Sequence, residues 1–328
     1  MIKPDASSLF SIRSADDFEK TALAFFRFQM ASNAIYRDYC RLLRCNPEKV
    51  ECIEEIPFMP VEFFKNGVVV ASNETPEAVF SSSGTTGHQT SRHYVTDLQL
   101  YIRSFTEGFQ YFYGKPENYC ILALLPSYFE RNGSSLVFMA DRLIKISGHL
   151  DSGFYLDNMK ALSEKLLALK ERRQPVILLG VTYALLDLAE TFPIHFPELI
   201  IMETGGMKGR RREMVRHEVH QQLMQAFGTA AIHSEYGMTE LLSQAYSKAN
   251  GIFFCPPWMK ILIRDTNDPL SLVGHGKTGG INIIDLANLN SCSFIAVQDL
   301  GKTSADGSFE VLGRFDHSQV RGCNLLVN

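Results

Sequence analysis

The run Ser81–Gly87 has the composition of a phosphate-binding loop. It reads Ser-Ser-Ser-Gly-Thr-Thr-Gly, so that hydroxyl side chains stand beside two glycines. Glycine permits a tight backbone with positive φ whose N–H groups can surround an anion, and hydroxyls add donors for phosphate oxygens. The run is not a Walker A motif, because His88 follows Gly87 where that motif has lysine. A polar surface loop is the alternative for such a stretch taken alone, but the downstream sequence favours phosphate binding.

The downstream run is Tyr236-Gly237-Met238-Thr239-Glu240. An aromatic ring can stack on a purine, a hydroxyl can bond an α-phosphate, and a carboxylate can hold Mg²⁺ through its oxygens. A Tyr-Gly turn that opens a helix is the simpler interpretation of this run alone. Together the two runs favour the binding of a phosphate-bearing ligand.

Alternating helices and strands are expected to position these runs. We expect helices over 96–112, 134–146, from a cap at Asp157 to 169, and over 210–227, and strands at 119–125, 176–179, 199–202 and 229–232. Apolar, β-branched runs that alternate with helices indicate right-handed βαβ units and a doubly wound, mostly parallel sheet of the α/β class. Ligands bind such sheets at the carboxyl ends of the strands. Thr204-Gly205-Gly206 and residues 233–240 follow strands there, and we expect the glycines to let the backbone approach a flat ligand.

The ends of the chain differ from this middle part. Ser14 is expected to cap an N-terminal helix, with short strands at 68–70 and 78–80. Beyond about Asn250, short strands at 261–263, 281–284, 293–297 and 309–311 alternate with glycine-rich turns. We therefore expect an α/β nucleotide- and acyl-binding region over 1–248 and a smaller β-rich subdomain over 249–328.

The two polar runs resemble motifs of the adenylate-forming superfamily, which includes acyl-CoA ligases, luciferase and the adenylation domains of peptide synthetases. Residues 82–87 resemble its phosphate loop, and residues 236–240 resemble its Tyr-Gly-x-Thr-Glu motif. Asp299 resembles the aspartate that holds the ribose hydroxyls, and Gly313-Arg314-Phe315-Asp316 with Arg321-Gly322 resembles the hinge motif. The resemblance implies that ATP and Mg²⁺ are cofactors in activating a carboxylic acid as its acyl-adenylate. It implies cofactor-binding residues at Ser82, Ser83, Gly84, Thr85, Gly87, Thr204, Gly205, Gly206, Tyr236, Gly237, Asp299 and Arg314, catalytic residues at Thr86, Thr239 and Glu240, and a metal ligand at Glu240.

Within this superfamily the chain is most similar to the LuxE-type acyl-protein synthetases of the bacterial luminescence fatty-acid reductase, and it also resembles phenylacetate-CoA ligases. Residues 56–65, Ile-Pro-Phe-Met-Pro-Val-Glu-Phe-Phe-Lys, look like the N-terminal signature of the LuxE group. In that group the acyl group passes from AMP to a cysteine near the C-terminus and then to a reductase partner. Cys323 stands at the matching place, and the charge of Arg321 would favour its thiolate. The resemblance thus implies Cys323 as a catalytic nucleophile, against the alternative of a bystander cysteine.

The chain departs from the superfamily pattern at its end. Typical members continue into a C-terminal domain with a lysine that assists adenylation, whereas this sequence stops at Asn328. Lys208 is a candidate substitute, with a solvated lysine as the alternative. Three functions stay open: an acyl-protein synthetase that takes a fatty acid and serves an acyl-reductase or acyl-carrier partner, a ligase that uses CoA as acceptor, and a silent nucleotide-binding or scaffold subunit.

Charge, hydrophobicity and cysteine content weigh against several classes of protein. The net charge of −4 and the pI near 6.2 weigh against a nucleic-acid binder, and no apolar run approaches the ~20 residues of a membrane span. Seven scattered cysteines without CxxC, and no signal-like N-terminus, predict a reducing, cytoplasmic setting. His217 and His220 share one side of an expected helix without a visible third ligand, so we expect a solvated face there rather than a metal site.

Overall fold

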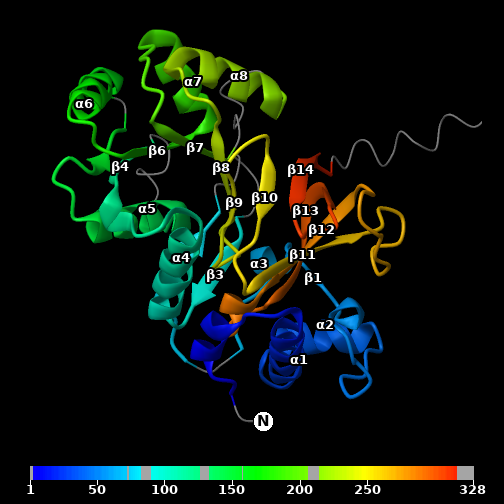
Figure 1. The fold of residues 1–328 in the computed structure, drawn as a ribbon. Coiled ribbons are helices and arrows are strands. Elements are labelled where there is room, and N and C mark those ends of the chain that lie inside the picture. The colour runs from blue at the N-terminus through cyan, green and yellow to red at the C-terminus, as the bar shows by residue number, and fades with distance from the viewer. Residues whose placement is uncertain are drawn as a thin grey trace, which may run out of the picture. The chain divides into compact units, whose positions relative to one another are not determined.

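The computed structural model describes residues 3–71, 74–82, 90–125, 133–156, 158–205 and 214–315. By their contacts the residues form two compact units (Figure 1). The first unit joins Met1–Glu74 to Pro257–Asn328, and the second unit is Thr75–Pro256. The N-terminal residues thus group with the C-terminal strands, whereas the sequence assigned them to the α/β region that ends at residue 248. The contacts between the N-terminal and C-terminal segments join residues far apart in the chain. Hydrophobic periodicity predicts single helices and strands, but it does not predict such long-range contacts.

The second unit is an α/β layer structure with a mostly parallel sheet, as the sequence predicts. Its elements are β2 (Ala78–Ser81), β3 (Arg92–Val95), α4 (Leu98–Tyr113), β4 (Cys120–Leu124), α5 (Ser135–Ser147), β5 (Gly153–Phe154), α6 (Met159–Glu171), β6 (Val176–Val181), α7 (Thr182–Thr191), β7 (Ile200–Thr204), α8 (Arg216–Phe227), β8 (His233–Tyr236), β9 (Ala245–Ser247) and β10 (Ile252–Phe254). Strands β5, β4, β6, β7 and β8 are neighbours in that order and run parallel. Strands β9 and β10 continue the order antiparallel.

Helices cover both sides of this sheet, because its central strands are apolar on both faces. Every residue of β4 and β6 is buried. In Figure 1, α5 lies on one side of β4 and β6, and α7 and α8 lie on the other. Helix α5 forms where the sequence predicts a helix over 134–146, and Ser134 Oγ caps its start by accepting a hydrogen bond from Val137 N at 3.3 Å. The cap of α6 is Asn158, whereas the predicted cap Asp157 lies outside the described residues.

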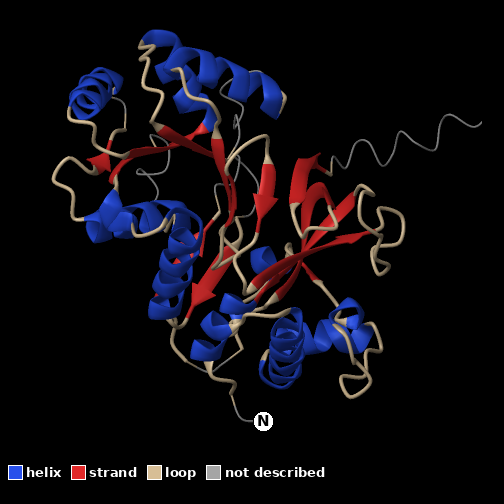
Figure 2. Cartoon of the chain, in the orientation of Figure 1, coloured by secondary structure: helices blue, strands red, loops and turns tan. Residues whose placement is uncertain are grey.

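The first unit packs helices against an antiparallel sheet (Figure 2). Its elements are α1 (Ala15–Ser32), α2 (Ala34–Leu42), β1 (Met59–Pro60), α3 (Phe63–Asn66), β11 (Met259–Arg264), β12 (Gly279–Asp285), β13 (Phe294–Thr303) and β14 (Phe309–Arg314). Strands β11 to β14 pair in sequence order, and β1 pairs parallel with β13. Ser14 caps α1 in a capping box with Asp17, which confirms the predicted start of that helix. The four predicted C-terminal strands are confirmed.

The strand expected at 68–70 is wrong. This segment is held by single hydrogen bonds from a turn, in which Ser291 Oγ donates to Val69 O at 2.9 Å and Asn290 O accepts from Ala71 N at 2.8 Å. No strand ladder therefore forms along it. Among the described residues, none of the helices combines the length and the apolar character that crossing a bilayer requires.

Candidate nucleotide-binding site

The expected phosphate loop connects the two strands of a hairpin. Strands β2 and β3 pair antiparallel, with Ser81 opposite Arg92. Beyond that pair, Ser82 N donates to Ser91 O at 3.1 Å and Ser91 N donates to Ser82 Oγ at 2.9 Å. Ser82 therefore lies at the closed base of the loop. The other predicted loop residues, Ser83, Gly84, Thr85, Thr86 and Gly87, lie outside the described residues.

His93, in β3, connects this hairpin to the second polar run. Its Nδ1 atom lies 2.8 Å from the backbone carbonyl oxygen of Thr239. A carbonyl can only accept, so Nδ1 carries the proton. Burial lowers the pKa of His93 to about 4, although the bond to Thr239 opposes that shift, so the ring is neutral near pH 7. The hydrogen bond thus connects strand β3, which follows the expected phosphate loop, to the run 236–240.

The second run begins on β8 and continues into a turn. Tyr236 is the last residue of β8, and Gly237 follows it. A Cβ atom on Gly237 would lie 2.4 Å from Glu235 Oε1, so a larger residue there would require the Glu235 carboxylate to move. Glu240 is buried, with 5% of its surface exposed. Within the described ranges no three His, Cys, Asp or Glu side chains cluster as a metal site.

The predicted strand at 229–232 is wrong: β8 covers His233–Tyr236. The His, Ser and Glu side chains of β8 do not form an apolar run. The more apolar residues 229–232, just before it, therefore gave the stronger strand pattern. These polar side chains are buried or half-buried because adjacent elements supply their partners. Helix α8 likewise begins at Arg216 rather than Arg210, since residues 214 and 215 are not helical.

The other predicted adenine segment follows β7, the strand beside β8. Thr204 lies opposite Glu235 in the register, and Thr204 Oγ1 donates to Glu235 Oε2 at 2.5 Å. Gly205 has φ of +72°, a conformation that glycine adopts without strain. Burial raises the pKa of Glu235 to about 7, and the charge of Glu203 adds to this, whereas the Thr204 bond opposes it. Thr204, Gly205 and Tyr236 thus lie at the carboxyl ends of adjacent strands, and Gly206 lies outside the described residues.

Glu203 forms a second buried polar cluster, which the sequence did not predict. Thr182 Oγ1 donates to its Oε2 at 3.0 Å, and Oε1 lies 3.7 Å from Arg216 Nε and 3.6 Å from His220 Nε2. Burial by itself raises the pKa of Glu203, but His220, Arg216 and Ser234 outweigh it and the net pKa lies below the usual value. The expected solvated face is therefore wrong for His220, which is 5% exposed, while His217 is exposed.

The predicted ribose residues lie together in the first unit. Asp299 in β13 and Arg314 in β14 are partners across the strand pair, and Arg314 Nε lies 3.2 Å from Asp299 Oδ1. The carboxylate is largely buried, whereas the arginine side chain is 74% exposed. The structure therefore brings these two predicted residues into one ion pair. The hinge residues Asp316 and Arg321, and Cys323, lie outside the described residues.

The N-terminal signature segment supports the strand that carries Asp299. Met59 and Pro60 pair with β13, and Val61 N donates to Ala296 O at 2.9 Å. Farther along, the Gln298 side-chain amide donates to the carboxylate of Glu62. The signature motif was recognised in the sequence, but its contact with β13 was not predicted.

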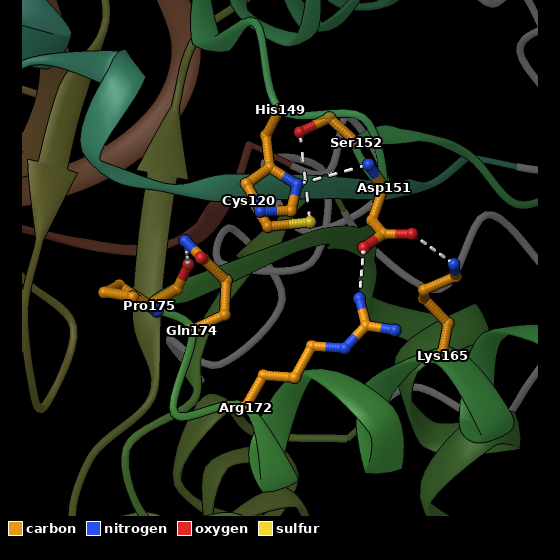
Figure 3. A network of polar contacts seen from close by, with 8 residues as sticks. All are labelled: Cys120, His149, Asp151, Ser152, Lys165, Arg172, Gln174 and Pro175. Carbon is orange, nitrogen blue, oxygen red and sulfur yellow. Dashed lines mark hydrogen bonds and ion pairs between the residues drawn. The ribbon is translucent and has the colours of Figure 1, made fainter.

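A separate polar network surrounds Asp151 (Figure 3). Its carboxylate bonds the ammonium of Lys165 and lies 3.1 Å from Arg172 Nη1. The neighbouring Ser152 accepts from Ile121 N at 2.9 Å and donates to Cys120 Sγ. Cys120 is the first residue of β4, so this network lies at the amino end of the parallel strands, away from the predicted site. Its bonds fix β5 beside β4, and burial raises the pKa of the Cys120 thiol to about 11, which leaves it unreactive.

Comparison with solved structures shows the fold of adenylate-forming ligases. A 2-hydroxyisobutyryl-CoA ligase structure in the postadenylation state with 2-HIB-AMP superposes with a TM-score of 0.70 at 14% sequence identity, covering 95% of this chain and 72% of that chain. ATP-bound MatB from Rhodopseudomonas palustris gives a TM-score of 0.54 at 14% identity, covering 75% of this chain and 48% of that one. The chain thus spans about half the length of MatB. At these identities the likeness establishes the fold alone.

Sequence comparison gives the family. No curated protein matches the chain significantly. Residues 10–328 match the family described as acyl-protein synthetase, LuxE. This match covers nearly the whole sequence, including both polar runs and the signature segment, and the chain belongs to the LuxE acyl-protein synthetase family.

Proposed function

We propose that this protein uses ATP to convert a carboxylic acid into its acyl-adenylate and then transfers the acyl group to a thiol. The bond between His93 and Thr239 carries the proposal, because it ties the strand after the phosphate loop to the run that ends in Glu240. Membership of the LuxE family supports the same chemistry.

In the first step a carboxylate oxygen attacks the α-phosphorus of ATP. The bond from that phosphorus to the bridging oxygen breaks, and pyrophosphate leaves with the electron pair. The protein contributes mainly position and charge neutralisation. Residues 82–87, which include the catalytic candidate Thr86, bind the β- and γ-phosphates, and Thr239 contacts the α-phosphate. Bound Mg²⁺ would neutralise phosphate charge, and Glu240 fits as its protein ligand, since Mg²⁺ commonly takes one or two carboxylates beside substrate phosphates.

The nucleoside is bound through two groups of residues. Thr204, Gly205 and Gly206 lie along the adenine, and Tyr236, with Gly237 behind it, stacks on its ring. The bond from Thr204 to Glu235 supports this assignment, because it joins the glycine segment to the strand that carries Tyr236. Asp299 is assigned to the ribose hydroxyls and Arg314 to the ribose or phosphate, following the motif resemblance.

In the second step a thiolate attacks the acyl carbonyl carbon, a thioester forms, and AMP leaves. Cys323 is our candidate nucleophile on the basis of its place in the motif, with a fatty acid as substrate and an acyl-reductase or acyl-carrier protein as acceptor, in the cytoplasm. CoA is a second candidate acceptor. It is favoured by the likeness in fold to 2-hydroxyisobutyryl-CoA ligase with 2-HIB-AMP and CoA in the thioesterification state, at a TM-score of 0.68.

ATP–pyrophosphate exchange across a panel of carboxylic acids tests the first step. We expect exchange with at least one acid and a fall of about a hundredfold in Glu240→Gln. Glu107→Gln, at an exposed ion pair on α4, is the matched control. An absence of exchange with every acid contradicts the proposal and favours a scaffold subunit, while wild-type activity in Glu240→Gln contradicts the metal assignment.

Mass spectrometry after incubation with ATP and the preferred acid separates the two acceptors. A covalent acyl adduct that disappears in Cys323→Ser supports transfer to the protein. Acyl-CoA formed in solution, without a protein adduct, supports CoA as the direct acceptor.

A further inference from the structure

A row of four buried residues crosses strands β7, β8, β9 and β10 on one face of the second unit. In the register, Glu203 lies opposite Ser234, Ser234 opposite Ser247, and Ser247 opposite Phe253. None of the four exposes more than 6% of its surface. Residues opposite each other on neighbouring strands point to the same face. A carboxylate and an aromatic ring therefore flank two small side chains.

Arg216 spans this row from α8. Its Nε atom lies 3.7 Å from Glu203 Oε1, and its Cζ atom lies 5.2 Å from the centre of the Phe253 ring. The small side chains of Ser234 and Ser247 leave room for the guanidinium to pass between its two partners. The guanidinium thus forms an ion pair with Glu203 and a cation–π contact with Phe253. These two contacts depend on the positive charge and on the planar shape of the guanidinium.

The place of Arg216 is unfavourable for the helix itself. It is the first residue of α8, where a cation opposes the helix dipole. The turn between β9 and β10 also closes on it: Gly251 has φ of +67°, and a Cβ atom there would lie 2.8 Å from Arg216 Cδ. Arg216 is thus held by an ion pair, by a cation–π contact and by packing of its aliphatic stem. Since its place weakens the helix, we attribute that place to these contacts with other elements.

The ring that Arg216 contacts supports Tyr236. The centroids of Phe253 and Tyr236 are 6.0 Å apart, with the rings inclined at 64° in an edge-to-face arrangement. Tyr236 follows Ser234 by two residues on β8, so both side chains lie on the same face of the strand. A continuous series of contacts therefore runs from Glu203, next to Thr204, through Arg216 and Phe253 to Tyr236.

We propose that Arg216 is a positioning residue for nucleotide binding, which holds the Phe253 ring against Tyr236 so that Tyr236 is fixed before ATP binds. The inference rests on the proposed function, in which Tyr236 stacks on adenine. A side chain that is already ordered loses little entropy on binding, which strengthens affinity. Arg216 therefore acts on binding of the base and leaves binding of the phosphates unchanged.

Arg216→Met tests the proposal, because methionine retains an apolar stem but removes the guanidinium. We expect the KM for ATP and the inhibition constant of adenosine to rise about fivefold, with kcat changed by less than about twofold. The inhibition constant of inorganic tripolyphosphate, which has no base, stays at the wild-type value. Arg216→Lys falls between the two proteins, since it keeps the charge but loses the plane.

Arg142→Met is the matched control. Arg142, in α5 of the same unit, lies 5.3 Å from the centre of the Phe138 ring, so it loses a contact of the same kind. We expect it to lower the thermal midpoint without a change in the KM for ATP. Folding of every variant is checked by circular dichroism before kinetics.

Equilibrium dialysis of adenosine separates the failure of this inference from failure of the proposed function. An unchanged adenosine affinity in folded Arg216→Met overturns the role of Arg216, as does an equal weakening of tripolyphosphate, which would indicate general loosening. Weaker adenosine binding in the variant supports Arg216 even if no acid gives exchange, an outcome that overturns only the proposed reaction. A wild-type protein that binds no adenosine or ATP overturns both.

Discussion

The Nδ1 atom of His93 lies 2.8 Å from the carbonyl oxygen of Thr239, although 146 residues separate them in the sequence. One residue follows the expected phosphate loop, and the other precedes the carboxylate of Glu240. A single neutral imidazole therefore connects the two segments that we assign to the ATP phosphates. Because the Nδ1–H group of His93 donates to a backbone oxygen, it fixes the backbone at position 239 independently of the side chain there.

Removing this donor should lower the exchange rate. We expect His93→Leu to reduce ATP–pyrophosphate exchange by about tenfold to a hundredfold, since small displacements of groups around a reacting phosphate have effects of that size. His93→Asn retains an N–H donor in a similar place and should keep more activity than the leucine variant. His149→Leu, which removes a 3.2 Å bond from Asp151 N at the other end of the strands, is the control and should leave exchange near the wild-type rate.

The same histidine should make the protein sensitive to acid. Its folded pKa of about 4 lies below the ordinary value of 6.5, so the unfolded chain binds the proton more tightly. The stability from neutral His93 is complete above pH 6.5 and is lost as the pH falls toward 4, by about 3 kcal/mol. The difference in unfolding free energy between wild type and His93→Asn, measured in urea from pH 4.5 to 7.5, should therefore change with pH. A constant difference would contradict the buried, neutral imidazole.

Glu235 should make the folded protein less stable as the pH rises, which is opposite to the effect of His93. Burial raises its folded pKa to about 7 from an ordinary value of 4.5, so the native state holds a proton that the unfolded chain releases. Its contribution is complete below pH 4.5 and is lost as the pH rises through 7, by about 3 kcal/mol. Glu235→Gln keeps an acceptor for Thr204 and does not titrate. Relative to wild type, the variant should therefore gain stability between pH 5 and 8, and parallel stability curves would contradict this assignment.

Much of the fold follows from local patterns, whereas the site depends on contacts that such patterns cannot report. The capping of α1 by Ser14 and the apolar runs of β4 and β6 are local signals, and the structure confirms them. Strand β8 was misplaced because its polar residues find partners on other elements. Periodicity describes which side of one element is apolar, but it does not say which distant residue lies opposite.

His220 and Arg216 illustrate the same limit within the site. On an isolated helix a histidine and an arginine predict a solvated face. Here Glu203, brought in by β7, offers a buried carboxylate that both side chains approach. The motif residues were recognisable because their types and order resemble a family, whereas the partners of Glu203 follow no local pattern.

The thiols of the described core should be inert in the native protein. Burial raises the pKa of Cys40 to about 12, and it raises the pKa of Cys292 further. We expect iodoacetamide at pH 7.5, followed by peptide mapping, to leave Cys40, Cys120 and Cys292 unlabelled until denaturant is added. Labelling of Cys323 in the native protein would support its proposed role. Rapid native labelling of Cys40 or Cys292 would contradict the burial described here.

Gln29 should be essential to the stability of the first unit. Its fully buried side chain joins α1 to the segment before β13: Nε2 donates to Asn288 O and Leu289 O, both at 2.9 Å, and Oε1 accepts from Ser293 N at 3.0 Å. Gln29→Ala leaves these buried backbone groups without partners, so we expect a loss of about 3 kcal/mol in unfolding free energy, measured in urea. Thr21→Ala, on the exposed side of the same helix, removes one hydroxyl bond to Asp17 O and should change stability by less than about 0.5 kcal/mol. Equal effects of the two substitutions would mean that water replaces the glutamine, and that the N-terminal helices are held to the C-terminal strands by apolar packing alone.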